Sequence, residues 1–369
     1  MKSVATVLQS THLSFSEFAS QSEQWKSSVL GSLCFSHPSQ FAPSQFAGQD
    51  NSDYMPGLPF IQVPMSIIDG ADCCCEIWRS QTALTQGQRG ALRYRCDNET
   101  LFGVMVMPEV PAAPSGQNQQ TPLQHATESA YRQIFALLDE LDYPFVLRFW
   151  NYMADINGTS HGLERYHQFT LGRQDAFLAC GREVIGKVPA ACALGYTQAM
   201  AQNPLIIAVL AGRTAPLAIE NPRQMSAYRY PPQYGPRSPS FSRASLVSLG
   251  QDALLFISGT ASIVGHETLH AKDVVAQTRE TLANIKAVLS EANRQASQPL
   301  FNLANLYYRV YVRHVADMSL IREEMHRSIG AEFKAIFLQA DICRPDLLLE
   351  IEATAGHPLT LSGAHRGQR

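Results

Sequence analysis

The protein has 369 residues, of which 45% are hydrophobic and 17% are charged, so it can bury a sizeable core, and its length suggests two or three domains. Its formal net charge of −3 offers no basic field for nucleic acid or an anionic membrane. No stretch approaches the roughly 20 apolar residues of a membrane span, and the first residues do not resemble a secretory signal. We therefore expect a cytoplasmic protein.

The chain contains eight cysteines, none of which forms a C-x-x-C pair. A chain of this size does not need a disulfide framework, so we expect the cysteines to be reduced. Cys73, Cys74 and Cys75 follow one another directly. Neighbouring side chains of a strand point to opposite faces, which makes the run a poor metal site and favours a structural role.

The first half of the chain begins with residues 1–55, which are rich in Ser and Gln and weakly patterned. We expect an extended arm or short strands laid on the body of the protein. From residue 91 the hydrophobic pattern becomes clear. It predicts strands at 91–97 and 101–108, a helix at 124–141, a strand at 145–156, a helix within 161–180, and strands at 190–196 and 205–210.

The second half repeats this order. It predicts strands at 245–249 and 253–259, a helix at 273–292, a strand at 307–314, a helix at 318–329, and strands at 335–342 and 347–353. Such a duplication indicates an α+β fold of two similar domains, which we place at 1–215 and 216–369. Each would carry an antiparallel-rich sheet with helices on one face. Two such sheets can pack around a pseudo-symmetric axis and leave clefts at their junction.

Residues 252–289 resemble the Rid (YjgF) family. The resemblance lies in a strand that ends in ISG, an Asp that starts the following helix, and the residues Gln277, Arg279 and Asn284. The stretch 346–353 (DLLLEIEA) is similar to the last strand of that family, including its acidic residue, here Glu350. The resemblance implies two Rid-like domains, of which the first has diverged. Small Rid proteins are trimeric and often act as imine deaminases.

A longer set of segments resembles the chorismatases. They are GLERYHQFTLGR at 162–173, the Pro- and Tyr-rich stretch 220–244, ISGTASIVGH at 257–266 and ADICRPDLLLEIE at 340–352. The resemblance implies removal of the enolpyruvyl group of chorismate, with release of pyruvate and either a hydroxybenzoate or a dihydroxylated cyclohexadiene acid. It implies neither a cofactor nor a metal.

Glu350 lies in an otherwise apolar strand, LLLEIEA, where it shares one face with Glu352. That face is either exposed to solvent or lines a cleft between the domains. In a cleft, burial would raise the pKa of the carboxyl group and make it an acid able to protonate the weakly basic enol-ether carbon. The resemblance places the catalytic acid at Glu350.

Cys343, taken alone, would be a small buried apolar residue. Chorismatases with Cys at this position resemble the hydroxybenzoate formers, and those with Ala resemble the hydrolytic type. The resemblance therefore implies 3-hydroxybenzoate, with 4-hydroxybenzoate as a second candidate product. We expect Glu350 to protonate the enolpyruvyl methylene, the neighbouring ring hydroxyl to displace the activated group, and Cys343 to assist opening of the resulting arene oxide. Exclusion of water would select this product.

A dianionic substrate needs guanidinium groups, which pair with carboxylates in a bidentate manner. Arg148 lies in the apolar strand FVLRFWNY, as either an edge-strand residue or a ligand. Small residues at the end of the ISG strand allow a ligand to approach the backbone. The predicted substrate-binding set is Arg148, Tyr152, Arg165, Arg243, Gly259, Thr260 and Ala261, with Arg223 and Arg237 in reserve. We expect no metal at His266 and His270, because they lie in a loop without a third ligand.

Three functions remain open at this stage. The first is a chorismatase, with hydrolysis of chorismate to the diene acid as a variant. The second is a Rid-like imine deaminase that uses the same cleft, and the third is a non-catalytic ligand-binding protein. The expected partner is chorismate alone, with neither nucleic acid nor membrane. A duplicated chain fills part of a trimer's symmetry by itself, so we expect a monomer or a small homo-oligomer.

Overall fold

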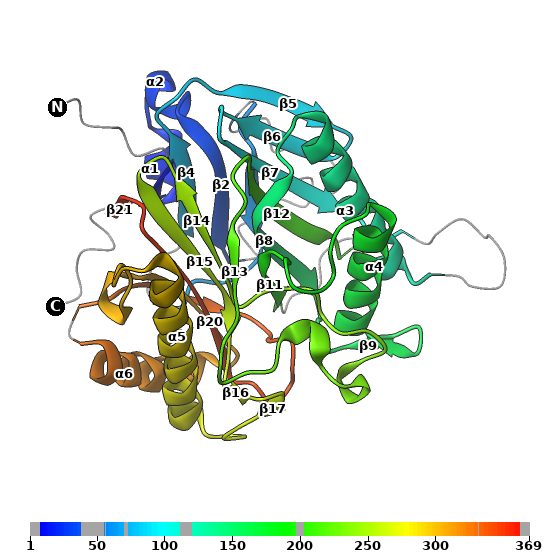
Figure 1. The fold of residues 1–369 in the computed structure, drawn as a ribbon, viewed down its shortest axis with the longest axis vertical. Coiled ribbons are helices and arrows are strands. Elements are labelled where there is room, and N and C mark those ends of the chain that lie inside the picture. Colours follow the sequence, from blue (N-terminus) through cyan, green and yellow to red (C-terminus); the bar gives the residue numbers. More distant parts are fainter. Residues whose placement is uncertain are drawn as a thin grey trace.

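The computed structural model describes residues 8–37, 55, 57–69, 73–110, 120–196, 203–330 and 332–361. Three large β-sheets meet at the centre of the molecule (Figure 1). Helices α3 and α4 cover the outer side of one sheet, and α5 and α6 cover the outer side of another. Within the described ranges, no helix combines the length and the apolar character that crossing a membrane requires.

The first six-stranded sheet has the order β11-β8-β12-β7-β6-β5. Its elements are β5 (Thr85–Arg89), β6 (Leu92–Cys96), β7 (Thr100–Met107), β8 (Phe145–Ala154), β11 (Ala190–Tyr196) and β12 (Leu205–Gly212), with the helices α3 (Pro122–Glu140) and α4 (Arg165–Ala179). The short hairpin β9 (Thr159–Ser160) and β10 (Leu163–Glu164) precedes α4. Thr121 caps α3, and Pro122 fits its first turn, where no amide donor is needed.

The second six-stranded sheet has the order β13-β14-β15-β20-β18-β19. Its elements are β13 (Leu217–Ile219), β14 (Ala244–Leu249), β15 (Asp252–Thr260), β18 (Tyr307–Val312), β19 (Lys334–Gln339) and β20 (Leu349–Ala355), with the helices α5 (Val274–Ala296) and α6 (Met318–Ile329). The hairpin β16 (Ile263–Val264) and β17 (Glu267–Thr268) follows β15. Asp273 caps α5 by accepting from the amide of Ala276 at 2.9 Å.

The duplication predicted from the sequence is confirmed. The order β11-β8-β12-β7-β6 of the first sheet matches β19-β18-β20-β15-β14 of the second, strand for strand. In both sheets the pair at the same end, β8 with β11 and β18 with β19, is parallel, and the pairs that follow it are antiparallel. The boundary at residue 215 stays a prediction, and the two sheets fall on either side of it.

Of the two expectations for the N-terminal segment, an extended arm or short strands laid on the body, the structure shows strands, and they form a full sheet. Its strands β1 (Leu8–Leu13), β2 (Val29–Ser36), β3 (Phe60–Val63) and β4 (Cys73–Ser80) join the C-terminal β21 (Leu359–Leu361) in a sheet ordered β21-β1-β4-β2-β3. The order β3-β2-β4-β1, with β2 and β3 parallel, repeats the module a third time. Between β1 and β2 the long helix is replaced by the short α1 (Phe15–Ala19) and α2 (Glu23–Lys26). Residues 1–7 and 38–54 of this segment lie outside the described residues.

One expectation about the cysteines is wrong. Cys34 and Cys75 form a disulfide, because the antiparallel register of β2 and β4 places them directly opposite each other. Cys73 and Cys74 are not part of a disulfide. The run Cys73 to Cys75 belongs to a strand, as its predicted structural role requires.

A buried ionic network joins the three sheets. Arg148 of β8 pairs with Glu352 of β20, Glu352 also pairs with Arg309 of β18, and Arg309 continues to Glu76 of β4. The side chains of all four residues are less than 7% exposed. Two positive and two negative charges therefore compensate one another where water cannot solvate them.

We predict that Arg309→Met strongly destabilises the protein. The substitution leaves Glu76 and Glu352 buried with one cation fewer, and breaking a buried pair costs about 3–5 kcal/mol. Denaturant unfolding measures the loss of free energy. Arg294→Met is the control, because Arg294 lies on the surface of α5 and pairs only with the partly exposed Glu291; it should cost less than about 1 kcal/mol. Equal losses from the two substitutions would contradict the structural weight given to the network.

Candidate active site

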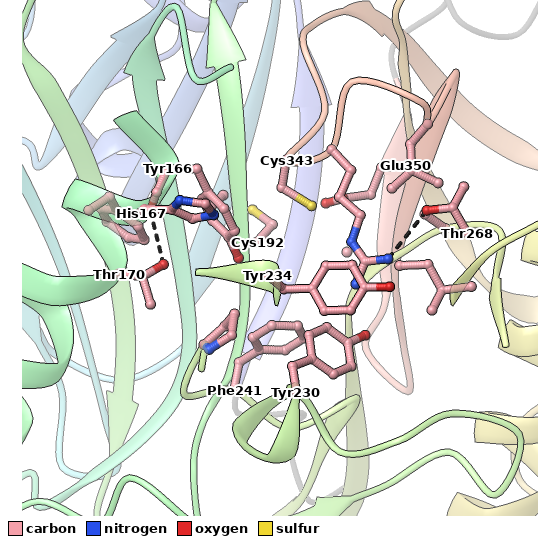
Figure 2. A pocket seen from close by; sticks show the side chains of 18 of the residues that line it. Tyr166, His167, Thr170, Cys192, Tyr230, Tyr234, Phe241, Thr268, Cys343 and Glu350 are labelled. Atoms are coloured by element: carbon pink, nitrogen blue, oxygen red, sulfur yellow. Dashed lines mark hydrogen bonds between the residues drawn. The ribbon is translucent and has the colours of Figure 1, made fainter. Parts of the chain in front are cut away.

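A cavity of about 610 Å³ opens at the junction of the two six-stranded sheets (Figure 2). Its first wall comes from α4 and β11, and its second from β15, β20 and the loop that precedes β20. The segment between β13 and β14 adds aromatic side chains from Tyr230, Tyr234 and Phe241. The cavity therefore lies where the sequence predicts a cleft, between the two copies of the module.

Glu350 faces this cavity because of the alternation of β20. Leu349 and Ile351 point into the core beneath the helices, and Glu350 and Glu352 point to the opposite face. Glu350 is buried, and burial raises the pKa of its carboxyl group to about 8, with the charge of Glu352 adding to the effect and Arg148 and Arg243 opposing it. At neutral pH the group is a protonated acid.

Gly259 makes room for this carboxyl group. A Cβ atom built on Gly259 would overlap Oε1 of Glu350. The backbone of β15 is therefore one wall of the acid's own niche, and a glycine is needed there because of close approach rather than because of a special dihedral angle. Ala261, two residues further along the same face, also lines the cavity.

Cys343 lies in the loop between β19 and β20 and lines the same cavity. Burial raises the pKa of its thiol to about 12, and the nearby Glu350 adds to the shift, while Arg344 and Arg313 oppose it. The group is therefore a neutral thiol, so it neither attacks as a thiolate nor acts as a strong base.

The structure brings together five of the nine predicted site residues, Glu350, Cys343, Arg243, Gly259 and Ala261. Thr260 is not among the lining residues, because its side chain points to the other face of β15, where its hydroxyl donates to the carbonyl of Ser258 at 2.8 Å. The chemical roles of the five that do line the cavity stay predictions.

Arg148 and Tyr152 do not reach the cavity. Arg148 is held by Glu352 and by the carbonyl of Ile257 at 3.0 Å. Tyr152 lies on the same face of β8, and its hydroxyl accepts from Arg309 at 3.1 Å. Both belong to the ionic network between the sheets, so we do not retain them as substrate ligands.

Arg165 is also engaged elsewhere. Its guanidinium group forms two hydrogen bonds with Glu109, at 2.9 and 2.5 Å, and a third with the carbonyl of Ala154 at 2.8 Å. The reserve residues are likewise committed, Arg223 to Glu280 and Arg237 to Asp175.

Two arginines that the sequence reasoning did not select line the cavity. Arg173 lies on α4, and Nε and Nη2 of its buried guanidinium group find no acceptor among the described residues. Arg344 follows Cys343, and its Nη2 is unpaired in the same sense. Because Tyr166, Thr170 and Arg173 are spaced four and three residues apart, they share one face of α4, and this spacing was the signal that could have identified Arg173.

Aromatic rings contact two of the arginines that line the cavity, Arg344 and Arg243. The guanidinium group of Arg344 lies 3.9 Å from the centre of the Tyr234 ring and donates to the carbonyl of His266 at 2.9 Å. Arg243 lies 5.3 Å from the Phe241 ring and donates to the hydroxyl of Tyr230 at 2.9 Å, while its Nε is unpaired within the described chain. Figure 2 shows Tyr230, Tyr234 and Phe241 along one side of the cavity. Such a site can bind an anionic ring compound, with acid chemistry available at Glu350.

Comparison with known proteins identifies the family of this chain. Residues 76–211 match the family model described as chorismatase FkbO/Hyg5-like, N-terminal. The chain is 36% identical to a 3-hydroxybenzoate synthase of Streptomyces hygroscopicus over 306 residues, which are 80% of this chain and 85% of that protein. It is 36% identical to a chorismatase of Streptomyces rapamycinicus over 283 residues, 75% of this chain and 80% of the relative. A chorismatase crystal structure superposes with a TM-score of 0.78 at 28% identity and covers 96% of this chain and 100% of its own.

We predict that Glu350→Gln changes how stability depends on pH. The folded carboxyl group has a pKa of about 8, whereas an unfolded Glu titrates near 4.3. Folding therefore takes up a proton between these values, and wild type should lose stability relative to Glu350→Gln as pH rises from about 5 to 9, by an amount on the order of a few kcal/mol. Thermal unfolding of both proteins across this range measures the difference. Parallel curves for the two proteins would show that Glu350 is ionised in the folded state.

Proposed function

Because this chain belongs to the chorismatase family, we propose that it is an enzyme that removes the enolpyruvyl group of chorismate and releases pyruvate and 3-hydroxybenzoate. The observation that carries the proposal is the protonated, buried Glu350 in a cavity where three arginines retain unpaired donors. A carboxylic acid without an ion pair suits proton donation to carbon, and the arginines suit a substrate with two carboxylates.

We assign substrate binding to Arg173, Arg243 and Arg344. Each lines the cavity and has at least one buried N–H group without an acceptor in the described chain. An unpaired buried donor is costly, and a carboxylate oxygen would satisfy it. The two carboxylates of chorismate would therefore replace the missing partners, with the ring between the aromatic side chains and Glu350. This set replaces Arg148 and Arg165 of the sequence prediction.

In the first step, Glu350 donates its proton to the methylene carbon of the enolpyruvyl group. The π electrons of the double bond form the new C–H bond, and the ether oxygen stabilises the resulting cation. The ring hydroxyl on the neighbouring carbon then attacks the carbon that bears the ether. The ring C–O bond breaks with its electron pair on oxygen, so that pyruvate leaves as a ketone. The hydroxyl proton restores the acid form of Glu350, and an arene oxide remains.

The same activated ether could be attacked by water, which would give the dihydroxycyclohexadiene acid instead. The thiol of Cys343 occupies a part of the cavity that a smaller side chain would leave to solvent. We therefore assign to Cys343 the exclusion of water from the ring, which leaves the internal hydroxyl as the nucleophile, and a supporting role when the oxide opens.

The chain repeats its sheet module three times, so the pseudo-symmetry of a trimer is contained in one molecule. This supports a monomer or a small homo-oligomer with one active site per chain. A cytoplasmic location, and the absence of partners other than the substrate, stay predictions.

We predict that the purified protein converts chorismate to pyruvate and 3-hydroxybenzoate without added cofactor. Glu350→Gln should lower the rate by about 10³-fold or more, because general acid catalysis contributes 10²–10⁴-fold. For wild type, kcat/KM should be constant below about pH 8 and fall above it, because the acid form of Glu350 is then lost. Product chromatography with mass detection measures both. Glu291→Gln, on the surface of α5, is the matched control, and chorismate left untouched by wild type would refute the proposal.

We predict that Cys343→Ala changes the product more than the rate. The smaller side chain admits water beside the ring, so the share of dihydroxycyclohexadiene acid should rise several-fold at the expense of 3-hydroxybenzoate while pyruvate is still released. Cys180→Ala, a free cysteine outside the cavity, should leave the product ratio unchanged. An unaltered ratio in Cys343→Ala would remove Cys343 from product selection.

A further inference from the structure

The proposed reaction leaves one step, the opening of the arene oxide, without a strong hydrogen-bond donor. When the arene oxide opens, the electron pair of a ring C–O bond moves onto the oxygen, and an enzyme lowers this barrier with a hydrogen-bond donor fixed near that atom. The neutral thiol of Cys343 is a weak donor. Glu350 is directed at the enolpyruvyl methylene in the step before. A second, stronger donor should therefore face the ring.

Tyr166 is in position for this role. It belongs to the first turn of α4, on the face that also carries Thr170 and Arg173, and it lines the cavity with them. In the view of Figure 2, Cys343 lies between Tyr166 and Glu350. Burial keeps the pKa of the Tyr166 phenol well above the ordinary value, and the neighbouring Cys343 and Glu350 add to the shift. Tyr166 therefore stays protonated and able to donate.

The hydroxyl of Tyr166 has no hydrogen-bond partner within the described part of the chain. Buried tyrosines usually donate to a protein acceptor, as Tyr131 does to Asn151 at 2.7 Å, Tyr196 to the carbonyl of Pro204 at 2.7 Å and Tyr308 to the carbonyl of Leu303 at 2.6 Å. Among the described residues, no group forms a hydrogen bond with the phenol of Tyr166, although it lies beside Cys343 and Glu350 at the cavity. The donor is thus available to a bound molecule.

The ring is nevertheless held firmly. The amide of Tyr166 donates to the carbonyl of Ile156 at 3.0 Å, and its carbonyl accepts from the hydroxyl of Thr170 at 2.9 Å. Its ring is nearly parallel to that of Phe169, with 20° between their planes and 6.5 Å between their centres. A donor that is fixed by its backbone and its ring but left without an acceptor is preorganised for a ligand.

We propose that Tyr166 is a further catalytic residue, which donates a hydrogen bond to the ring oxygen of the oxide while its C–O bond breaks. The proposal rests on the chorismatase function proposed above. The bond's electron pair goes to the oxygen, which takes up a proton, and the ring carbon that keeps the oxygen loses one, so no proton is gained or lost overall. No electron is gained or lost overall, and the product is the phenol. The hydrogen bond strengthens only as negative charge develops on the oxygen.

Tyr166→Phe separates this step from the first. Pyruvate leaves before the oxide opens, so release of pyruvate should fall only slightly, whereas formation of 3-hydroxybenzoate should fall by about 10²-fold, the usual cost of one such donor. The ratio of 3-hydroxybenzoate to pyruvate, close to one for wild type, should therefore drop steeply as the oxide is diverted to other products. Tyr228→Phe, outside the cavity lining, is the matched control and should retain the wild-type ratio.

If Tyr166→Phe leaves the ratio of 3-hydroxybenzoate to pyruvate unchanged, the proposal is overturned. This includes an equal fall in both products, because a purely structural role would slow both steps alike. The proposed function fails in a different way, namely if wild type releases no pyruvate from chorismate. A binding measurement provides a second test. Tyr166→Phe should weaken binding of 3-hydroxybenzoate by about 3- to 10-fold, the value of one neutral hydrogen bond, and leave binding of benzoate unchanged. Equal effects on the two ligands would exclude a direct bond to the ring oxygen.

Discussion

Two buried arginines hold together the ionic network at the centre of the molecule. Arg148 and Arg309 both pair with Glu352, and Arg309 also reaches Glu76. Glu350 is only two residues from Glu352 on the same face of β20, yet no ion pair with it occurs in the described structure. Burial raises the pKa of Glu350 to about 8, and the charge of Glu352 adds to this shift, while Arg148 and Arg243 oppose it only in part. Within the network that joins the three sheets, Glu352 thus favours the protonated form of Glu350, the acid that the proposed reaction needs, and Arg148 opposes it.

Much of the fold could be predicted because its signals are local. Helix periodicity located α3, α5 and α6 within a few residues, and alternation in β20 correctly placed Glu350 and Glu352 on one face. Alternation does not predict which residues each carboxyl group contacts. The partner of Glu352 is Arg148, 204 residues earlier in the chain, and a sequence pattern carries no information on such a contact. An apolar strand that contains an arginine is equally typical of a ligand site and of a buried ion pair.

The predictions that were wrong also depended on tertiary contacts that a local sequence pattern does not contain. The N-terminal segment was expected to form an arm or short strands rather than a full sheet, because β1 (LQSTHL) and β2 (VLGSLCFS) contain Ser, Thr, His and Gly, which resemble loop residues. Nearly all of these residues are nevertheless buried between layers. Arg165 and Arg173 lie in the same matched segment, and the sequence did not show which of the two faces the cavity, so Arg165 was selected wrongly. On a helix one residue is a rotation of about 100°, so Arg165 turns away to Glu109, whereas Arg173 shares the cavity face with Tyr166.

The three copies of the module also explain why one chain should have one active site. In the strand pairs that meet at the network, Glu352 lies opposite Arg309, Leu210 opposite Arg148, and Glu76 opposite Leu33. The residues two positions earlier on the same three strands are Glu350, Ala208 and Cys74. Only the C-terminal copy therefore carries a carboxyl group at this level.

The niche of Glu350 further requires Gly259 on the neighbouring strand. The first copy contributes instead the opposite wall, with Tyr166 and Arg173 on α4, and in the N-terminal copy the long first helix is reduced to α1 and α2. The proposed chemistry thus depends on divergence between copies. In this proposal one copy supplies the acid and one the binding helix, and the third provides the carboxylate that completes the ionic network.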